Sequence, residues 1–134
     1  MKVVFTMLIL WLSSTALADD LVDCNRLSNT LEIKECLDLK IELSKMNLNR
    51  YFRVTIEENY EDVEFVKALE KAQEKWEGYM RSHCGMIQYS GTISGITVRN
   101  CEKRLIENRT HEIWREFLQS YGDEVVLPEP YLSQ

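Results

Sequence analysis

The residues of this 134-residue chain best suited to chemistry are its four cysteines and two histidines. Cysteine and histidine side chains at close spacing can bind a metal ion or form a nucleophilic pair. His83 directly precedes Cys84, but no spacing of cysteine and histidine here matches a zinc-binding pattern. The sequence also has no serine in a nucleophile elbow and no glycine-rich loop of the kind that binds phosphate. We therefore expect a protein that is not an enzyme and that uses no metal and no cofactor.

Residues 1–18 have the composition of a signal for export. Lys2 precedes an apolar run from Val3 to Leu12, and Ala16 and Ala18 mark a small-residue cleavage site. The run is shorter than the roughly 20 apolar residues that a membrane-spanning helix needs. We expect cleavage after Ala18, no membrane insertion, and a periplasmic or secreted protein. The remaining chain is long enough for one domain with a modest core.

The cysteines, Cys24, Cys36, Cys84 and Cys101, all lie beyond this segment. An even number of cysteines in an exported chain is typical of disulfide bonds, and four cysteines allow three pairings. We favour Cys24–Cys36 with Cys84–Cys101, because closing two short loops costs the least chain entropy. A disulfide-bonded Cys84 would be neither a metal ligand nor a nucleophile, which supports a role other than catalysis.

Three polar residues fall on or beside the apolar stripes of predicted helices. Gln73 and Arg109 occupy stripe positions, and Asn49 adjoins Leu48 in the middle of the first helix. Burying an amide or a guanidinium is costly unless it is hydrogen-bonded. We predict that Asn49, Gln73 and Arg109 form a polar network in the core that fixes the register of the helices. The alternative is that they line a binding pocket.

Three helices must position these residues. Apolar residues recur every three or four positions over Thr30 to Glu58, Val63 to Cys84 and Asn100 to Tyr121. Asn29 and Asp62 are suitable N-caps for the first two helices. No proline interrupts any of the three segments.

A glycine-containing segment joins the second helix to the third. We expect Gly85 to end the second helix, and residues 85–99 to form a short hairpin or an ordered loop. Residues 122–134 are expected to be an extended or frayed tail. The predicted fold is all-α, a three-helix antiparallel bundle over residues 19–121 with a disulfide-closed loop between the second and third helices.

Acidic residues outnumber basic ones in the chain. There are 22 aspartates and glutamates against 16 lysines and arginines, a formal net charge of −6 that becomes more negative once Lys2 is removed. Such a chain repels phosphate backbones and anionic lipid headgroups, so we expect no nucleic-acid partner. A basic protein is the kind of partner that this charge would attract.

The order of residues along the helices resembles that of a known family. Cys36 is followed by Leu48-Asn49-Arg50-Tyr51, and Cys84 is preceded by Leu69-x-x-Ala72-Gln73-x-x-Trp76-x-x-Tyr79. Cys101, Arg109 and the Glu112-Ile113 pair continue the pattern. From Cys24 to Phe117 the chain resembles the lysozyme-inhibitor LprI-like N-terminal domain family, whose members are exported, cysteine-paired and mostly helical.

The resemblance implies a small exported binding protein that inhibits lysozyme-type cell-wall hydrolases, many of which are strongly basic. We expect the 85–100 segment to contact this partner through Tyr89, Ser90, Thr92 and Ser94, because loops often carry binding residues. The alternative is that the segment only connects two helices. Two other functions stay open: an immunity protein that neutralises a secreted cell-wall-degrading toxin, and a structural protein of the cell envelope.

Overall fold

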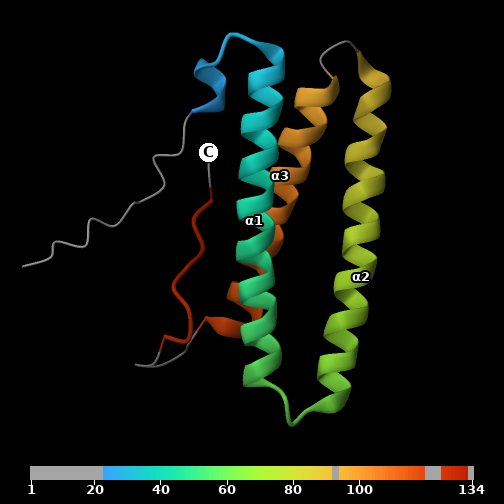
Figure 1. The fold of residues 1–134 in the computed structure, drawn as a ribbon. Coiled ribbons are helices and arrows are strands. Elements are labelled where there is room, and N and C mark those ends of the chain that lie inside the picture. Colours follow the sequence, from blue (N-terminus) through green and yellow to red (C-terminus); the bar gives the residue numbers. More distant parts are fainter. Residues whose placement is uncertain (1–22, 92–93, 120–124, 133–134) are drawn as a thin grey trace, which may run out of the picture.

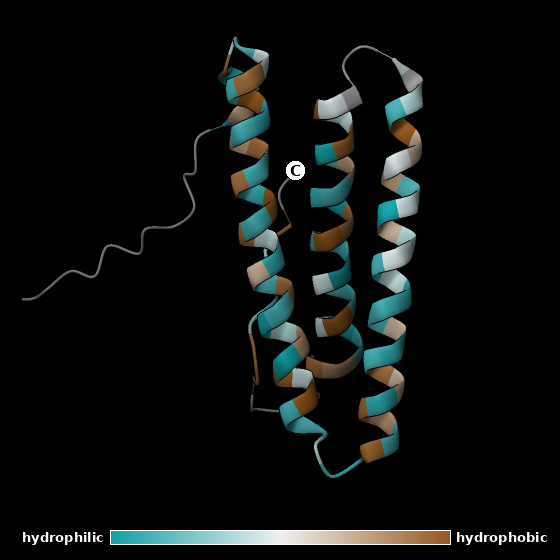
Figure 2. Cartoon of the chain, turned by 45° about the vertical axis from the view of Figure 1, so that its right-hand side comes forward, coloured by the Kyte–Doolittle hydropathy of each residue, from teal (hydrophilic) through white to brown (hydrophobic). Residues whose placement is uncertain are grey.

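The protein folds as three long antiparallel helices. A computed structural model describes residues 23–91, 94–119 and 125–132. The helices are α1 (Thr30–Glu58), α2 (Val63–Gly85) and α3 (Ser94–Ile113). In Figures 1 and 2, α3 lies between α1 and α2. The described residues contain no strand, so the predicted all-α bundle of three antiparallel helices is confirmed.

Both predicted N-caps begin their helices. The Asn29 side chain accepts a hydrogen bond from the backbone N–H of Leu31 at 2.9 Å. The Asp62 side chain accepts one from the backbone N–H of Phe65 at 3.0 Å. Each bond satisfies an N–H group that the first turn of a helix leaves without an intrahelical partner. The predicted and observed starts of α1 and α2 therefore coincide.

Three short helical turns accompany the long helices. The first is the 3₁₀ turn η1 (Cys24–Arg26), which precedes α1, and the second is the 3₁₀ turn η2 (Met86–Ser90), which follows α2. The third is the π-helical turn η3 (Trp114–Leu118), which continues α3. The third helix was predicted to run to Tyr121, which lies outside the described residues, and the chain is already extended at Gln119.

The connection predicted over residues 85–99 is shorter than expected, because helix occupies both of its ends. Gly85 has helical dihedral angles, φ −60° and ψ −30°, and the chain passes directly into η2. The backbone conformation that favours glycine comes instead at Gly91, which has φ 142°. The third helix begins at Ser94 rather than at Asn100.

Contacts with α1 explain the early start of α3. The first turns of α3 include Gly95 and three β-branched residues, Ile96, Thr97 and Val98, and both kinds of residue have low helix propensity. One turn later, the Arg99 guanidinium donates to both carboxylate oxygens of Asp38 on α1, at 2.6 and 3.1 Å. This bond raises the pKa of Arg99 above its already high ordinary value, so the cation persists. The low helix propensity of the first residues of α3 is thus outweighed by a contact between α3 and α1.

Both disulfides have the favoured pairing. Cys24–Cys36 joins η1 to α1 across 12 residues, and Cys84–Cys101 joins α2 to α3 across 17 residues. Cys84 is fully buried. The second disulfide therefore ties α2 to α3 beside their connection.

The apolar core is shared by all three helices. It is built from Ile41, Leu48 and Tyr51 of α1, Met80 and Cys84 of α2, Cys101, Ile106 and Ile113 of α3, Leu118 of η3, and Leu127. Figure 2 shows hydrophobic bands, in brown, alternating with hydrophilic bands, in teal, along each helix. The burial of one stripe per helix is what the spacing in the sequence predicts.

Residues 125–132 are not helical, and they pack against the bundle. The Tyr51 hydroxyl donates to the carbonyl of Pro128 at 2.7 Å, and the Trp114 indole N–H donates to the carbonyl of Leu127 at 3.0 Å. Leu127 is buried. Figure 1 shows this segment, in red, running beside α1. This part of the predicted tail is therefore extended and fastened to the core.

The predicted signal, residues 1–18, lies outside the described residues. Among the helices that the structure does describe, none is both long and apolar enough to cross a membrane.

Candidate binding surface

Gln73 and Arg109 meet between α2 and α3. The Gln73 side chain is buried, and its carbonyl oxygen accepts a hydrogen bond from Arg109 Nε at 3.2 Å. Arg109 Nη1 donates to Glu112 Oε2 at 2.8 Å, and the guanidinium carbon lies 5.9 Å from the centre of the Trp76 ring. The Gln73 amide nitrogen donates to Glu77 at 3.4 Å. The oxygen and the nitrogen of the Gln73 amide, and two nitrogens of the Arg109 guanidinium, therefore have hydrogen-bond partners, as buried polar groups require.

Asn49 does not join this pair. It was predicted as part of the same core network, but its side chain is exposed on α1. The adjoining Leu48 is buried, and successive residues of a helix point about 100° apart, so the two cannot share one face. The polar residue that α1 buries is Thr55, whose hydroxyl donates to the carbonyl of Tyr51 at 2.9 Å.

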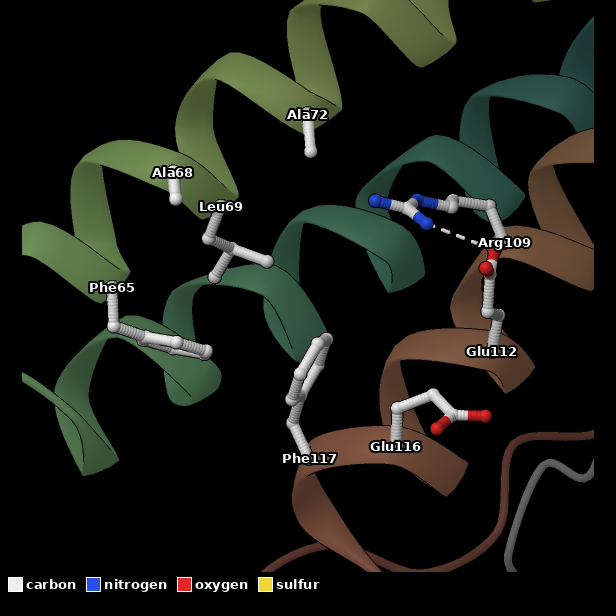
Figure 3. Close-up of a pocket in the computed structure, with 8 residues that line it drawn as sticks. All are labelled: Phe65, Ala68, Leu69, Ala72, Arg109, Glu112, Glu116 and Phe117. Carbon is white, nitrogen blue, oxygen red and sulfur yellow. Dashed lines mark hydrogen bonds and ion pairs between the residues drawn. The ribbon is translucent and has the colours of Figure 1, made fainter.

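A cavity opens beside the Gln73–Arg109 pair, between α2 and the end of α3. It has a volume of about 280 Å³ and is open to solvent on one side. We call it the α2–η3 groove. It is lined by Phe65, Ala68, Leu69, Ala72, Arg109, Glu112, Glu116 and Phe117 (Figure 3).

The walls of the α2–η3 groove are apolar, and its charged groups lie along one side. Phe65 of α2 and Phe117 of η3 are in edge-to-face contact, with ring centres 5.5 Å apart. Figure 3 shows Glu112 and Glu116 on the α3–η3 side, with the Glu112 carboxylate directed toward Arg109 and the Glu116 carboxylate directed away from α2. Glu116 Oε1 also accepts hydrogen bonds from Arg115, at 2.8 and 3.0 Å. The groove can hold an apolar group, and the carboxylates at its edge are already paired with Arg109 and Arg115.

Reasoning from the sequence missed this groove. Phe117 was assigned to the apolar stripe of the third helix, yet 42% of its surface is exposed. Phe65 lies four residues before buried Leu69, a spacing that places it on the same face of α2. The alanines at 68 and 72, also one turn apart, were the available signal, because small residues at this spacing leave room along a helix.

Tyr89, one of the predicted contact residues, lies at the opposite end of α2. Tyr89 follows α2 within η2 and is 84% exposed, and Met86 beside it is 63% exposed. Thr92 lies outside the described residues, as do the side chains of Ser90 and Ser94. The structure therefore presents one of the four predicted side chains at the surface.

The described residues hold no site with the features of a metal centre. Within 23–91, 94–119 and 125–132, no group of three His, Cys, Asp or Glu side chains is placed to hold a metal ion. The His83 ring stacks on Tyr79, with ring centres 5.2 Å apart, and Cys84 is bonded to Cys101. What the structure offers is a helical scaffold with two disulfides and a small groove between α2 and η3.

Comparison with known protein families identifies the family of this chain. Residues 24–113 match the family described as lysozyme inhibitor LprI, and the chain belongs to that family. No curated protein and no solved structure was found to match the chain. The family suggests a lysozyme-inhibitor role, and together with the two disulfides it indicates an exported protein, because disulfides persist in oxidising compartments.

Proposed function

We propose that the protein inhibits a basic lysozyme-type cell-wall hydrolase in the periplasm or outside the cell, by forming a stoichiometric complex with it. The observation that carries this proposal is the family match, which spans all three long helices. The net charge of −6 supports it, since an acidic protein is drawn toward a basic partner and associates with it faster.

The scaffold suits binding without catalysis. Two disulfides and the fastened 125–132 segment hold the helices in one arrangement before any partner arrives. A surface that is already ordered loses little conformational entropy on association, and more of the contact energy then appears as affinity.

The predicted contact through Tyr89, Ser90, Thr92 and Ser94 remains a proposal. The exposure of Tyr89 supports it, because exposed tyrosines are frequent anchors in protein interfaces. Replacing residues 89–94 by a glycine-serine segment tests it. Loss of inhibition with the helices intact would support a contact there, and full inhibition would assign the segment a connecting role only.

Calorimetry on the exported, oxidised protein tests the proposed function against its alternative. The protein is titrated into a c-type lysozyme and, separately, into a cell-wall amidase of the kind found among secreted toxins. We expect one-to-one binding to the lysozyme. Tight binding to the amidase with none to the lysozyme would contradict the proposal and support an immunity protein. Binding to neither hydrolase would favour the remaining alternative, a structural protein of the cell envelope.

A further inference from the structure

We propose that the outward face of α1 pairs with α1 of a second copy of this chain, in antiparallel orientation. The inference goes beyond the proposed function, because it concerns the association of the protein with itself. It follows from apolar side chains that the bundle leaves exposed on α1, and from the order of the charges on either side of them.

Three exposed apolar residues of α1 share one face of the helix. Leu39, Leu43 and Met46, which we call the α1 stripe, follow one another at steps of four and three residues, the spacing of neighbours on a helix surface. Leu39 is 55% exposed and Met46 is 67% exposed. At 3.6 residues per turn, the stripe lies on the side of α1 opposite to buried Ile41 and Leu48. A surface helix ordinarily has polar residues on that side.

The described neighbours of α1 lie on its other sides. Ser44 faces α3, since its hydroxyl donates to Glu107 at 3.4 Å, and Tyr51 meets the 125–132 segment. Figures 1 and 2 show α2 on the far side of α3. The packing of the bundle therefore leaves the α1 stripe open to a partner.

The charges on this face of α1 are ordered along the helix. Glu32 and Glu35 precede the α1 stripe, Arg50 and Arg53 follow it, and helical spacing places all four on the face of the stripe. Among the residues that the structure describes, no ion pair involves Glu32, Glu35 or Arg50. Arg53 is already paired with Glu57 on its own helix, at 3.5 Å. The face thus runs from acidic through apolar to basic, with Glu35 and Arg50 available to a partner.

This order of residues is complementary to itself. Glu35 lies as far before the midpoint of the α1 stripe as Arg50 lies after it, and Leu39 and Met46 are also equidistant from that midpoint. A twofold axis at the midpoint would set Glu35 against Arg50 of the second copy, and Leu39 against its Met46. Each of these contacts would form twice. A parallel pairing would instead set like charges against each other at both ends, so charge selects the antiparallel second copy.

Pairing through α1 is compatible with the surfaces already described. Since α3 lies between α1 and α2, the α2–η3 groove and the exposed Tyr89 would stay outside the interface. At 1.5 Å per residue, the contact from Glu32 to Arg53 would be roughly 32 Å long and one helix wide. Such a contact is at the small end of protein interfaces, so we expect a reversible dimer rather than a permanent one.

Charge reversal tests both the pairing and its direction. Sedimentation equilibrium of the exported, oxidised protein, from micromolar to near-millimolar concentration, measures the dissociation constant of the dimer. We expect Arg50→Glu and Glu35→Arg each to raise this constant by about tenfold or more, because each sets like charges against each other twice. The double variant restores opposite charges and should return to within about threefold of the unchanged protein. Lys75→Glu, which makes the same change of charge as Arg50→Glu on exposed α2, should shift the constant by less than about twofold.

Two methionines test the apolar part of the contact. Met46 on the α1 stripe and Met86 on η2 are 67% and 63% exposed, which makes them a matched pair. Met46→Glu should weaken the dimer by about tenfold or more, and Met86→Glu by less than about twofold. Circular dichroism checks that each variant keeps its helices.

The proposal is overturned if the protein sediments as a monomer at every concentration. A dimer that Arg50→Glu and Met46→Glu leave unchanged would also overturn it, since the contact would then lie away from the α1 stripe. Failure of the folded double variant to recover would overturn the antiparallel register. No hydrolase enters these measurements, so their outcome does not bear on the proposed function.

Discussion

The Gln73 amide is the point at which α2 and α3 exchange a buried hydrogen bond. Its oxygen accepts from Arg109 at 3.2 Å, and its nitrogen donates to Glu77 at 3.4 Å on its own helix. A buried polar group left without a partner costs more than the bond itself contributes. A shift of the two helices along their axes would break this bond, so we expect the pair to help set their register.

Replacing Gln73 with alanine should lower the free energy of unfolding by about 1–2 kcal/mol, because Arg109 Nε then loses its partner. Urea unfolding followed by circular dichroism measures the change. Glu74→Ala, one residue along and exposed, is the matched control and should change stability by less than about 0.5 kcal/mol. Equal stability of the two variants would mean that the Gln73–Arg109 bond does not hold the helices in register.

Tyr51 makes the stability of the protein sensitive to high pH. Burial raises the pKa of its phenol above the ordinary 10.0, against a smaller lowering by nearby Arg50. The folded state thus favours the neutral phenol, which donates to the Pro128 carbonyl. This contribution to stability is fully present below pH 10 and is lost as the pH rises through the raised pKa of the folded state.

Thermal unfolding from pH 8 to pH 11 checks this prediction. The unchanged protein should lose stability above about pH 10, and Tyr51→Phe should lose less over the same range because it has no phenol to ionise. Parallel curves for the two proteins would show that the Tyr51 phenol is not the group responsible.

At the scale of the elements, the Cys84–Cys101 disulfide compensates for the open packing of α2. The α2–η3 groove opens between α2 and the end of α3, while the disulfide joins the two helices at the other end. The bond closes a loop of 17 residues. Constraining a loop of this size in the unfolded chain contributes roughly 3 kcal/mol.

The double substitution Cys84→Ser with Cys101→Ser should therefore destabilise the protein by about 3 kcal/mol. Hydrogen exchange should also speed up most in α2, since this helix would separate from α3 before the core unfolds. The matched control is Cys24→Ser with Cys36→Ser, which frees only η1 from α1. An equal effect of both pairs on α2 exchange would contradict this role of the Cys84–Cys101 bond.

The sequence predicted the start of a helix where residues within one turn determine it, and not where contacts between helices determine it. Asn29 and Asp62 mark the starts of α1 and α2 in the sequence, because an N-cap bond is made within one turn. The start of α3 at Ser94 was missed, because it depends on the Arg99–Asp38 contact across 61 residues. The α2–η3 groove was missed for a similar reason: periodicity identifies the inner face of a helix but not how closely its neighbour approaches.

At the scale of the whole molecule, charge and shape coincide at one end of the bundle. The acidic turn between α1 and α2, the carboxylates of Glu112 and Glu116, and the α2–η3 groove all lie there. The sequence from Gly78 to Cys101, which includes the end of α2 and the start of α3, has no aspartate or glutamate. Such an asymmetry orients an approaching basic protein as well as attracting it, which raises the rate of productive encounters.

The most direct test of the proposed function is a titration of the exported, oxidised protein into a cell-wall lysis assay with a c-type lysozyme. The assay is run at low and at physiological salt. We predict that inhibition is complete near one equivalent and weakens as salt screens the charges. Undiminished lysis at every ratio and at both salt concentrations would contradict the assignment of this protein as a lysozyme inhibitor.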